Sequence, residues 1–270
     1  MKSLVNNIKN YFSLVKFSHT VFAMPFALIG FTLAVTLTEN QFSIKLLLLI
    51  ILCMVFARNA AMGFNRLADH RFDSLNQRTK NREIPSGIVS YKAGAIFVII
   101  NAILFITSTA FINRLTLYLS PVALFVILGY SLTKRFTALC HFILGLGLSL
   151  APIGAYISVT GKFALLPVIY SFIVLTWVSG FDIIYALQDD EFDRENSLFS
   201  VHSVKGRKMA IMISTVVHII TFMLVIIAGF VGKGSFLYWT GASIFSLLLI
   251  YQHLIIKPND ISKVNVAFGT

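Results

Sequence analysis

The segment from Ser43 to Phe64 reads SIKLLLLIILCMVFARNAAMGF and carries only two charged side chains, those of Lys45 and Arg58. An α-helix rises about 1.5 Å per residue, so a run of this length can cross the roughly 30 Å hydrocarbon core of a bilayer. Similar runs occur along the whole chain, near residues 17–37, 93–112, 115–132, 136–157, 163–187, 209–231 and 235–256. The pattern predicts an all-α, polytopic transmembrane helical bundle with about eight spans.

The composition agrees with a membrane protein. Hydrophobic residues make up 57% of the chain, charged residues only 12%, and the mean hydropathy is +0.83. This charged fraction is about half of that in soluble globular domains. The first apolar run shows no small-residue cleavage site, so we expect it to remain in the protein as its first helix. The lipid bilayer is therefore the first predicted partner.

The net charge is +11, and the distribution of the basic residues along the chain indicates the membrane topology. Lys and Arg are not gathered on one basic face with interleaved aromatic residues, so we predict no nucleic-acid partner. If the N-terminus faces the cytoplasm, seventeen basic residues lie on that side, and the opposite side has only four: Lys45, Arg114, Lys162 and Lys233. The asymmetry predicts that both termini and the long charged loops are cytoplasmic.

Two connecting segments, 65–92 and 188–208, are longer and more charged than the others. Nine of the eleven acidic residues lie in them or at their edges. The separation between Asp69 and Asp189 is 120 residues, which corresponds to four predicted helices. Repeats of this kind can form a cavity between the halves of a membrane protein. We therefore predict two four-helix halves around a central cavity, each contributing one acidic site.

The first acidic segment, residues 64–87, reads FNRLADHRFDSLNQRTKNREIPSG. Asn65, Asp69 and Asp73 are spaced by four residues, which places them on one face of a helix. Carboxylate and amide oxygens suit Mg²⁺, whose coordination is often completed by substrate phosphates. The spacing predicts that these three residues bind Mg²⁺, unless the segment is only a solvated loop. Cations nearby could bind the remaining oxygens of a diphosphate; they include Arg66, Arg78 and Arg82.

The second acidic segment, residues 180–200, reads GFDIIYALQDDEFDRENSLFS. Asp182, Asp189 and Asp193 share a helical face, and Asp182 lies at the edge of an apolar span, where an ionised carboxylate is costly and indicates function. Carboxylates so close together repel one another unless a cation neutralises them. We predict that these three residues bind a second Mg²⁺; the alternative is a charged helix end in water, paired with Arg194.

Other candidates lie at predicted cytoplasmic helix ends. Lys134 and Arg135, in YSLTKRF, could bind a diphosphate. Tyr130, Tyr185 and Lys16 are candidate substrate-binding residues. Lys and Arg also flank cytoplasmic helix ends, and Tyr lies at interfaces, for reasons of position alone.

The order of these motifs resembles the UbiA superfamily of intramembrane aromatic prenyltransferases, and in particular its 4-hydroxybenzoate polyprenyltransferase-like group. The resemblance covers nearly the whole chain. It rests on N-R-x-x-D-x-x-x-D at Asn65–Asp73, R-T-x-x-R-x-x-P-x-G at Arg78–Gly87, Y-S-x-x-K-R at Tyr130–Arg135 and D-x-x-Y-A-x-x-D at Asp182–Asp189. It implies nine transmembrane helices around a cavity, with two Asp-rich loops that bind Mg²⁺ and polyprenyl diphosphate.

The resemblance also implies an activity. We expect Mg²⁺-dependent transfer of a polyprenyl group from polyprenyl diphosphate to an aromatic acid or naphthoate acceptor, of the 4-hydroxybenzoate or dihydroxynaphthoate type. The product would serve ubiquinone or menaquinone biosynthesis at the bacterial inner (cytoplasmic) membrane. Asp69, Asp73, Asp182 and Asp189 are the expected catalytic residues, because charge placed beside the diphosphate makes it a better leaving group.

The chain departs from the family pattern at three points. Arg66 replaces an Asp found in many members. Phe199 stands where a Lys is common, which leaves Lys205 or Arg207 as candidates for that phosphate contact. The end of the chain, KVNVAFGT, predicts a single domain over residues 1–270 that lacks the family's last helix.

Two alternatives remain from the sequence. One is an enzyme of the same superfamily with another acceptor, such as protohaem, a chlorophyllide or a sugar phosphate. The other is a cation-coupled secondary transporter, although both acidic clusters fall at loop ends on one predicted side, whereas transporter sites lie near the midplane.

Overall fold

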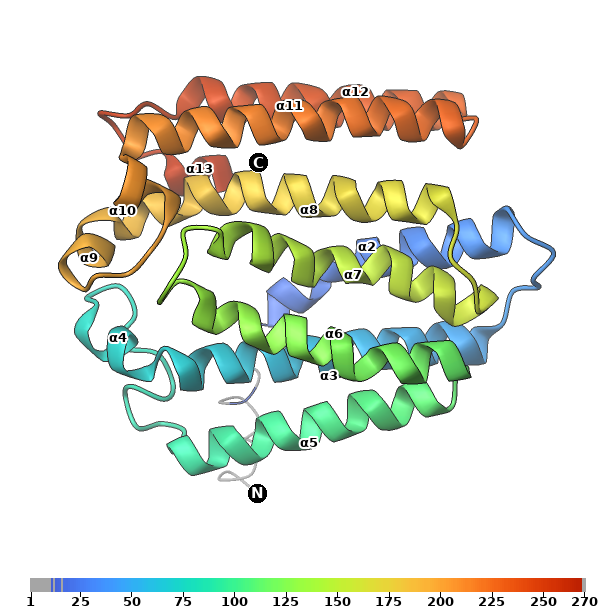
Figure 1. Cartoon of the computed structure of the whole chain (residues 1–270), viewed down its shortest axis with the longest axis horizontal. Coiled ribbons are helices and arrows are strands. Elements are labelled where there is room, and N and C mark those ends of the chain that lie inside the picture. Colours follow the sequence, from blue (N-terminus) through green and yellow to red (C-terminus); the bar gives the residue numbers. More distant parts are fainter. Residues whose placement is uncertain (1–10, 12, 16, 269–270) are drawn as a thin grey trace. The chain divides into compact units, whose positions relative to one another are not determined.

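The computed structural model describes the backbone of residues 11, 13–15 and 17–268, and the side chains of residues 11, 13–15 and 23–267. The secondary structure of the described part is helical, apart from an isolated bridge between Lys257 and Asp260. The all-α prediction is confirmed, because every predicted apolar run forms a helix (Figure 1): α2 (Phe17–Thr36), α3 (Ile44–Ala68), α5 (Tyr91–Ala110), α6 (Arg114–Thr133), α7 (Cys140–Thr160), α8 (Leu165–Ala186), α11 (Arg207–Val231) and α12 (Phe236–Ile255).

Six segments are long and apolar enough to cross a membrane: α3, α5, α6, α7, α11 and the stretch Leu165–Glu195 that begins with α8. The apolar part of α2 whose side chains are described begins only at Ala23. Helix α12 has 20 residues but is not among these six segments. For α2 and α12, membrane crossing therefore stays a prediction.

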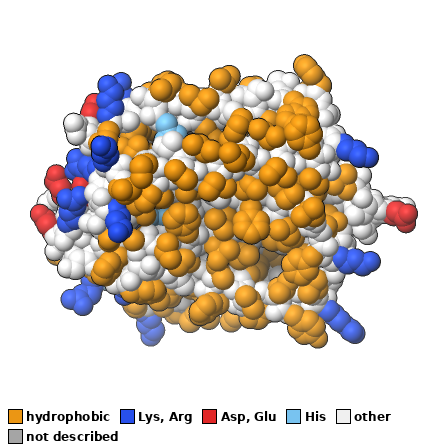
Figure 2. All heavy atoms as spheres, turned by 45° about the horizontal axis from the view of Figure 1, so that its top comes forward, with side chains coloured by type: hydrophobic (Ala, Val, Ile, Leu, Met, Phe, Trp, Pro, Cys, Tyr) orange, Lys and Arg blue, Asp and Glu red, His pale blue; other side chains and the backbone are white. Residues whose placement is uncertain are grey.

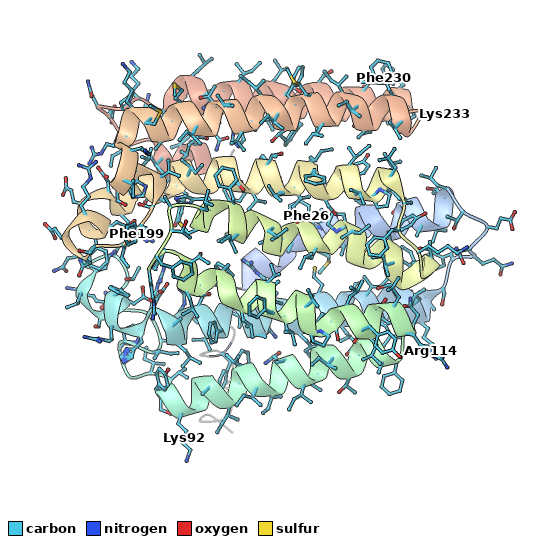
Figure 3. All side chains as sticks on the ribbon, viewed as in Figure 1. Phe26, Lys92, Arg114, Phe199, Phe230 and Lys233 are labelled. Atoms are coloured by element: carbon cyan, nitrogen blue, oxygen red, sulfur yellow. The ribbon has the colours of Figure 1, made fainter. Side chains whose placement is uncertain are left out.

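Large apolar side chains remain exposed on the helices, as Figure 2 shows for the drawn face. Phe236, at the start of α12, is 84% exposed, and Phe125 on α6 is 79% exposed. Such surface would be costly in water and is stable against lipid tails. Basic residues mark helix ends within this apolar surface. Lys92 near the start of α5 and Arg114 at the start of α6 lie at opposite ends of α5 (Figure 3).

The chain forms two compact units, and α7 contributes to both. The first unit extends to Ser131 and includes Leu150–Phe163; the second comprises Leu132–Ser149 and the chain from Ala164 onward. Two contacts explain why the end of α7 belongs to the first unit. Gly30 of α2 lies so close to the Pro152 backbone that a Cβ would overlap the Pro152 carbonyl. Asn113 also donates from Nδ2 to the carbonyls of Ile157 and Ser158, at 2.9 and 3.1 Å. The units therefore differ from the predicted four-helix halves, and the predicted central cavity stays a prediction.

In the first unit, α3 packs along α5, and the loop that follows α3 folds back onto this pair. Ile84 and Val89 of the loop join Leu14, Leu67 and Val98 in one buried cluster. The cluster anchors the loop from both sides of the short helix α4 (His70–Leu75), where the first acidic segment lies.

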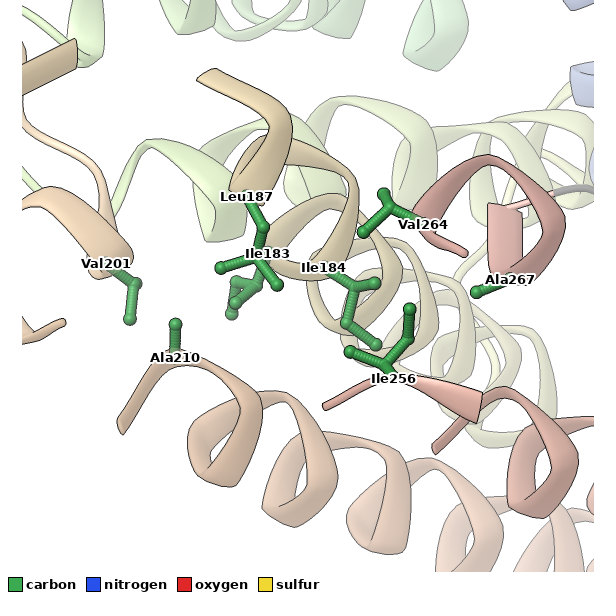
Figure 4. Close-up of a cluster of buried hydrophobic side chains, with 8 residues drawn as sticks. All are labelled: Ile183, Ile184, Leu187, Val201, Ala210, Ile256, Val264 and Ala267. Carbon is green, nitrogen blue, oxygen red and sulfur yellow. The ribbon is translucent and has the colours of Figure 1, made fainter. Parts of the chain in front are cut away.

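In the second unit, α8 packs along α11, and a buried cluster fixes the last turn of α8 (Figure 4). The cluster also includes residues of α10 (Val201–Lys205), α11 and α13 (Val264–Phe268). Between α8 and α10 lie the 3₁₀ turn η1 (Leu187–Asp189) and α9 (Asp190–Glu195). The core therefore holds the second acidic segment at both of its ends. Its members are Ile183, Ile184, Leu187, Val201, Ala210, Ile256, Val264 and Ala267.

Candidate functional site

The first acidic stripe crosses the junction between α3 and α4 without losing helical register. The N–H of Asp69 donates to the carbonyl of Asn65 at 2.9 Å, and the N–H of Asp73 donates to the carbonyl of Asp69 at 2.7 Å. Because these bonds span four residues each, Asn65, Asp69 and Asp73 share one helical face, as the spacing predicted.

The two carboxylates of this stripe are buried in different surroundings. Asp69 is 3% exposed, and its Oδ2 accepts a hydrogen bond from Asn65 Nδ2 at 3.2 Å. Asp73 is 5% exposed, and both of its oxygens accept from Arg82 Nη1, at 2.7 and 2.9 Å. Arg82, a predicted diphosphate-binding residue, therefore neutralises Asp73 in this structure.

The other predicted cations of the segment differ in exposure. Arg66 is buried on α3, its Nε finds no hydrogen-bond partner among the described residues, and it interacts electrostatically with Asp73. Arg78 is exposed in the turn after α4, where its N–H donates to Asn76 Oδ1 at 2.9 Å. A buried cation and an exposed one thus lie before and after the two carboxylates of the stripe in sequence.

A second basic residue of α3, Arg58, is a charge within a predicted span to which no sequence motif assigns a role. The structure leaves it half-buried, and its Nε has no hydrogen-bond partner in the described part of the chain. Tyr130, predicted to bind substrate, is half-buried on α6 and interacts electrostatically with both Arg58 and Arg66. The signal for Arg58 was its position, since an ionisable residue within a span is costly unless it is used.

In the second unit, Asp182 lies on α8 with its side chain 24% exposed. Its Oδ2 is 2.7 Å from Nδ1 of His141, a buried residue in the first turn of α7. Asp189 ends η1 and is half-buried. Tyr185 is half-buried and packs against the core cluster of this unit. Asp182 therefore presents a polar group with an identified histidine partner.

Asp190 and Asp193 have cationic or histidine partners. Asp190 Oδ2 lies 2.6 Å from Arg207 Nε, and its Oδ1 lies 3.0 Å from Arg194 Nε. Asp193 Oδ2 lies 3.2 Å from Nε2 of the fully buried His202. The pairing with Arg194 that the sequence offered as an alternative is thus present, although it engages Asp190 and not a predicted metal ligand.

The turn after α6 joins the end of the second acidic segment. The N–H of Phe199 donates to the carbonyl of Lys134 at 2.6 Å, and Cys140 Sγ donates to the Phe199 carbonyl at 3.4 Å. The Phe199 side chain is exposed in the loop before α10 (Figure 3). Lys134 is half-buried and Arg135 is exposed.

Of the two residues proposed to replace the Lys expected at position 199, Arg207 is engaged by Asp190 and Lys205 is exposed. Lys205 is therefore the better placed of the two to meet a phosphate. Lys16, predicted to bind substrate, lies outside the described residues.

The donor atoms fit incomplete magnesium sites. Among the described residues, no three His, Cys, Asp or Glu side chains converge as a metal-binding group. The candidate donors include the amide oxygen of Asn65 and the carboxylates of Asp69 and Asp182, and Mg²⁺ prefers such hard oxygen ligands. Oδ1 of Asp182 accepts no hydrogen bond from the described part of the chain. Since Mg²⁺ commonly uses one or two carboxylates and completes its shell with phosphates and water, the residues suit this ion.

Known proteins are similar to this chain over most of its length. The model of the UbiA prenyltransferase family matches residues 23–269. A 4-hydroxybenzoate octaprenyltransferase of Francisella tularensis subsp. novicida (strain U112) is 27% identical over 262 residues, which cover 97% of this chain and 92% of the relative.

Solved structures of UbiA homologs share the fold. An apo structure from Aeropyrum pernix K1 aligns with a TM-score of 0.85 and 28% identity, over 93% of this chain and 92% of that one. A homolog from Archaeoglobus fulgidus bound to DMAPP and Mg²⁺ aligns with a TM-score of 0.75 and 18% identity, over 96% and 95% of the two chains, and supports the fold alone. Together with the apolar spans, these matches show that the chain is an integral membrane enzyme that belongs to the UbiA prenyltransferase family.

Proposed function

We propose that this protein transfers a polyprenyl group from polyprenyl diphosphate to 4-hydroxybenzoate or a dihydroxynaphthoate, with Mg²⁺ as cofactor, in ubiquinone or menaquinone biosynthesis. The observation that carries the proposal is the presence of one stripe of oxygen donors in each unit. Support for the acceptor comes from the relative named 4-hydroxybenzoate octaprenyltransferase. Support for the cofactor comes from the oxygen donors of these stripes, which suit Mg²⁺, the ion that is bound in the Archaeoglobus fulgidus homolog structure.

The residues that would hold the cofactor are Asn65, Asp69 and Asp73 in the first unit, and Asp182, Asp189 and Asp193 in the second. Bound Mg²⁺ supplies positive charge that offsets the negative charge of the departing diphosphate. Because Arg82 now occupies both oxygens of Asp73, use of that carboxylate as a ligand frees the Arg82 guanidinium for charge-assisted bonds to phosphate oxygens. Arg66, already buried beside Asp73, adds a second positive charge.

The reaction we propose is an electrophilic aromatic substitution. The C–O bond between the prenyl group and the diphosphate breaks, and the diphosphate leaves with the electron pair. A ring carbon of the acceptor, made electron-rich by its hydroxyl group, forms the new C–C bond, and the ring proton passes to a base or to the departing diphosphate. Apolar helix faces hold the prenyl tail and exclude water, which would otherwise capture the cation.

Arg58 favours an acidic acceptor over a neutral one. Its half-buried guanidinium lies within a predicted span, and its Nε lacks a hydrogen-bond partner among the described residues. A cation in such a place is stabilised by an anion, and a carboxylate matches the guanidinium fork. We therefore assign the acceptor carboxylate to Arg58.

An acceptor panel tests this assignment. Purified protein is incubated with labelled polyprenyl diphosphate and either 4-hydroxybenzoate, 1,4-dihydroxy-2-naphthoate, homogentisate or the neutral control hydroquinone. We expect product with one of the acids. Arg58→Gln should raise the KM for that acid roughly ten- to hundredfold, which corresponds to the free energy that a charge-assisted hydrogen bond contributes to binding. The KM for the prenyl diphosphate should change less than about threefold. Equal changes in both KM values would contradict the assignment of Arg58, and product with none of the acids would contradict the proposed acceptor class.

We further propose that both acidic segments face the cytoplasm of a bacterium, which can be tested with single cysteines. In a background with Cys53→Ala and Cys140→Ser, the exposed residues Arg78, Glu195 and Lys162 are replaced one at a time by Cys. In sealed right-side-out vesicles, a membrane-impermeant thiol reagent should label position 162 only, since the positive-inside distribution places 78 and 195 within. Labelling of one acidic segment but not the other would favour a cation-coupled transporter instead.

A further inference from the structure

We propose that His141 is a positioning residue, which holds Asp182 through a hydrogen bond and leaves Oδ1 of that carboxylate available to a magnesium–diphosphate complex. This inference rests on the proposed function. The sequence alone gave no reason to select His141, a single histidine at the start of an apolar run.

The packing of α7 against α8 fixes this pair. Gly145 lies one turn after His141, and Ser179 lies about one turn before Asp182. A Cβ at Gly145 would meet Ser179 Oγ and the carbonyl of Leu175, so the two helices are in close contact there. This contact sets the register that brings His141 Nδ1 to 2.7 Å from Asp182 Oδ2. The hydrogen bond is therefore part of the interface between α7 and α8 in the second unit.

The opposite side of the imidazole ring is also held in place. The backbone N–H of Val201 donates to His141 Nε2 at 3.4 Å. The ring is therefore positioned at both nitrogens, and Nδ1 stays directed at the Asp182 carboxylate.

The first unit offers a useful contrast. Arg82 covers both oxygens of Asp73 and carries a positive charge, so that carboxylate must exchange partners before it can bind a metal. At Asp182 one oxygen is anchored, the other accepts no hydrogen bond from the described residues, and the side chain is 24% exposed. Asp182 is therefore ready to bind without rearrangement.

The start of α10 links His141 to a second histidine. His202 lies next to Val201, and its ring centroid is 6.4 Å from that of His141. Nε2 of His202 contacts Asp193 Oδ2 at 3.2 Å and Ser200 Oγ at 2.9 Å. Ser200 and Ser203 form a capping box that fixes the first turn of α10. The same turn therefore orients His141 and receives Asp193, so two predicted metal ligands share one rigid support.

Two conservative variants separate the contacts of His141. Asn places its amide Nδ2 near the position of Nδ1 and can still donate to Asp182. Gln places its amide near the position of Nε2, so it can meet Val201 but not Asp182. Partners of ligating carboxylates typically contribute 10- to 100-fold in metal affinity. We expect His141→Gln to weaken binding by about that factor, and His141→Asn by less than about threefold.

The measurements do not depend on turnover. Mn²⁺ binding is followed by electron paramagnetic resonance, and binding of geranyl S-thiolodiphosphate, an unreactive diphosphate, by calorimetry in the presence of Mg²⁺. His253→Asn is the matched control, because it makes the same change at a histidine of the same unit whose recorded contacts are Thr215 and His218. Thermal unfolding of each variant reports whether it is folded.

Each outcome decides the question. The proposal is supported if His141→Gln alone weakens both probes, and if Asp182→Asn, alone or combined with His141→Gln, gives a similar loss, since coupled residues are non-additive. If His141→Gln folds poorly, the affinities of Asp182→Asn and His141→Asn are compared instead. The proposal then expects a loss of binding in Asp182→Asn but not in His141→Asn. Native affinity in His141→Gln, or an equal loss in His141→Asn, would overturn the positioning role. Failure of the unmodified protein to bind either probe would instead overturn the proposed function.

Discussion

In excess EDTA, we expect the purified protein to form no detectable prenylated product, and to regain its activity when Mg²⁺ is restored in excess. The physical reason is repulsion between like charges. The acidic segment of each unit contains several carboxylates, Asp69 and Asp73 in the first and Asp182, Asp189 and Asp193 in the second, and a diphosphate brings further negative charge to either. Arg66 and Arg82 alone would leave most of this charge uncompensated. The measurement is the initial rate of prenyl transfer at saturating substrates, with and without chelator.

A loss of structure would give the same loss of activity, so the unfolding temperature in EDTA is the necessary control. We expect it to change little, because Asp73 and Asp190 pair with arginines and Asp182 and Asp193 contact histidines within the protein. Full activity in EDTA would contradict a metal-dependent mechanism. Activity restored by Mg²⁺ but not by the larger Ca²⁺ would agree with the preference for octahedral oxygen ligation.

For Asp73→Asn, we expect turnover to fall on the order of a hundredfold or more, the scale seen when a main electrostatic contact to a transition state is removed. The substitution keeps size and hydrogen-bonding capacity but removes the charge that a metal needs. Lys80→Gln, an exposed residue of the same loop that we assign to membrane orientation, should change turnover several-fold at most. Both variants are compared by initial rates at saturating Mg²⁺ and equal membrane abundance.

Asp73 also holds Arg82, and a third variant separates this structural role from the catalytic one. Arg82→Gln removes the ion pair but leaves the Asp73 carboxylate in place. If Asp73 acts as a metal ligand, Arg82→Gln should retain more activity than Asp73→Asn while lowering the unfolding temperature by a similar amount. Equal, small losses in Asp73→Asn and Lys80→Gln would mean that the stripe has only a structural role.

The sequence predicted the helices well because an apolar run long enough to span a bilayer has few other stable conformations. Helix ends were less certain. Helix α3 continues four residues past Phe64, because polar residues such as Asn65 and Arg66 continue the helical hydrogen bonding beyond the apolar run. Helix α7 begins at Cys140, later than the predicted 136, because the preceding residues form a turn in which Thr137 Oγ1 accepts from the N–H of Leu139 at 3.2 Å.

The partners of the acidic residues were much harder to predict. Spacing identifies residues that share a helical face, which is why Asn65, Asp69 and Asp73 could be grouped. It does not reveal which side chain from another helix will meet them. His141 and Asp182 are 41 residues apart, and their contact depends on the packing of α7 against α8. Arg82 was recognised as a cation, but its use of both Asp73 oxygens depends on how the loop folds back onto α3.

The membership of α7 in both units has a consequence for biosynthesis. Gly30 of α2 is packed against the backbone of Pro152, so this contact cannot form until about 120 further residues have been made. At ribosomal rates of about 5–20 residues per second, the delay is roughly 6–24 s. During that time the glycine face of α2 remains open in the nascent chain, exposed to lipid, to the insertion machinery or to another helix. The first unit is the first to be translated, yet it can be completed only after synthesis of the second has begun.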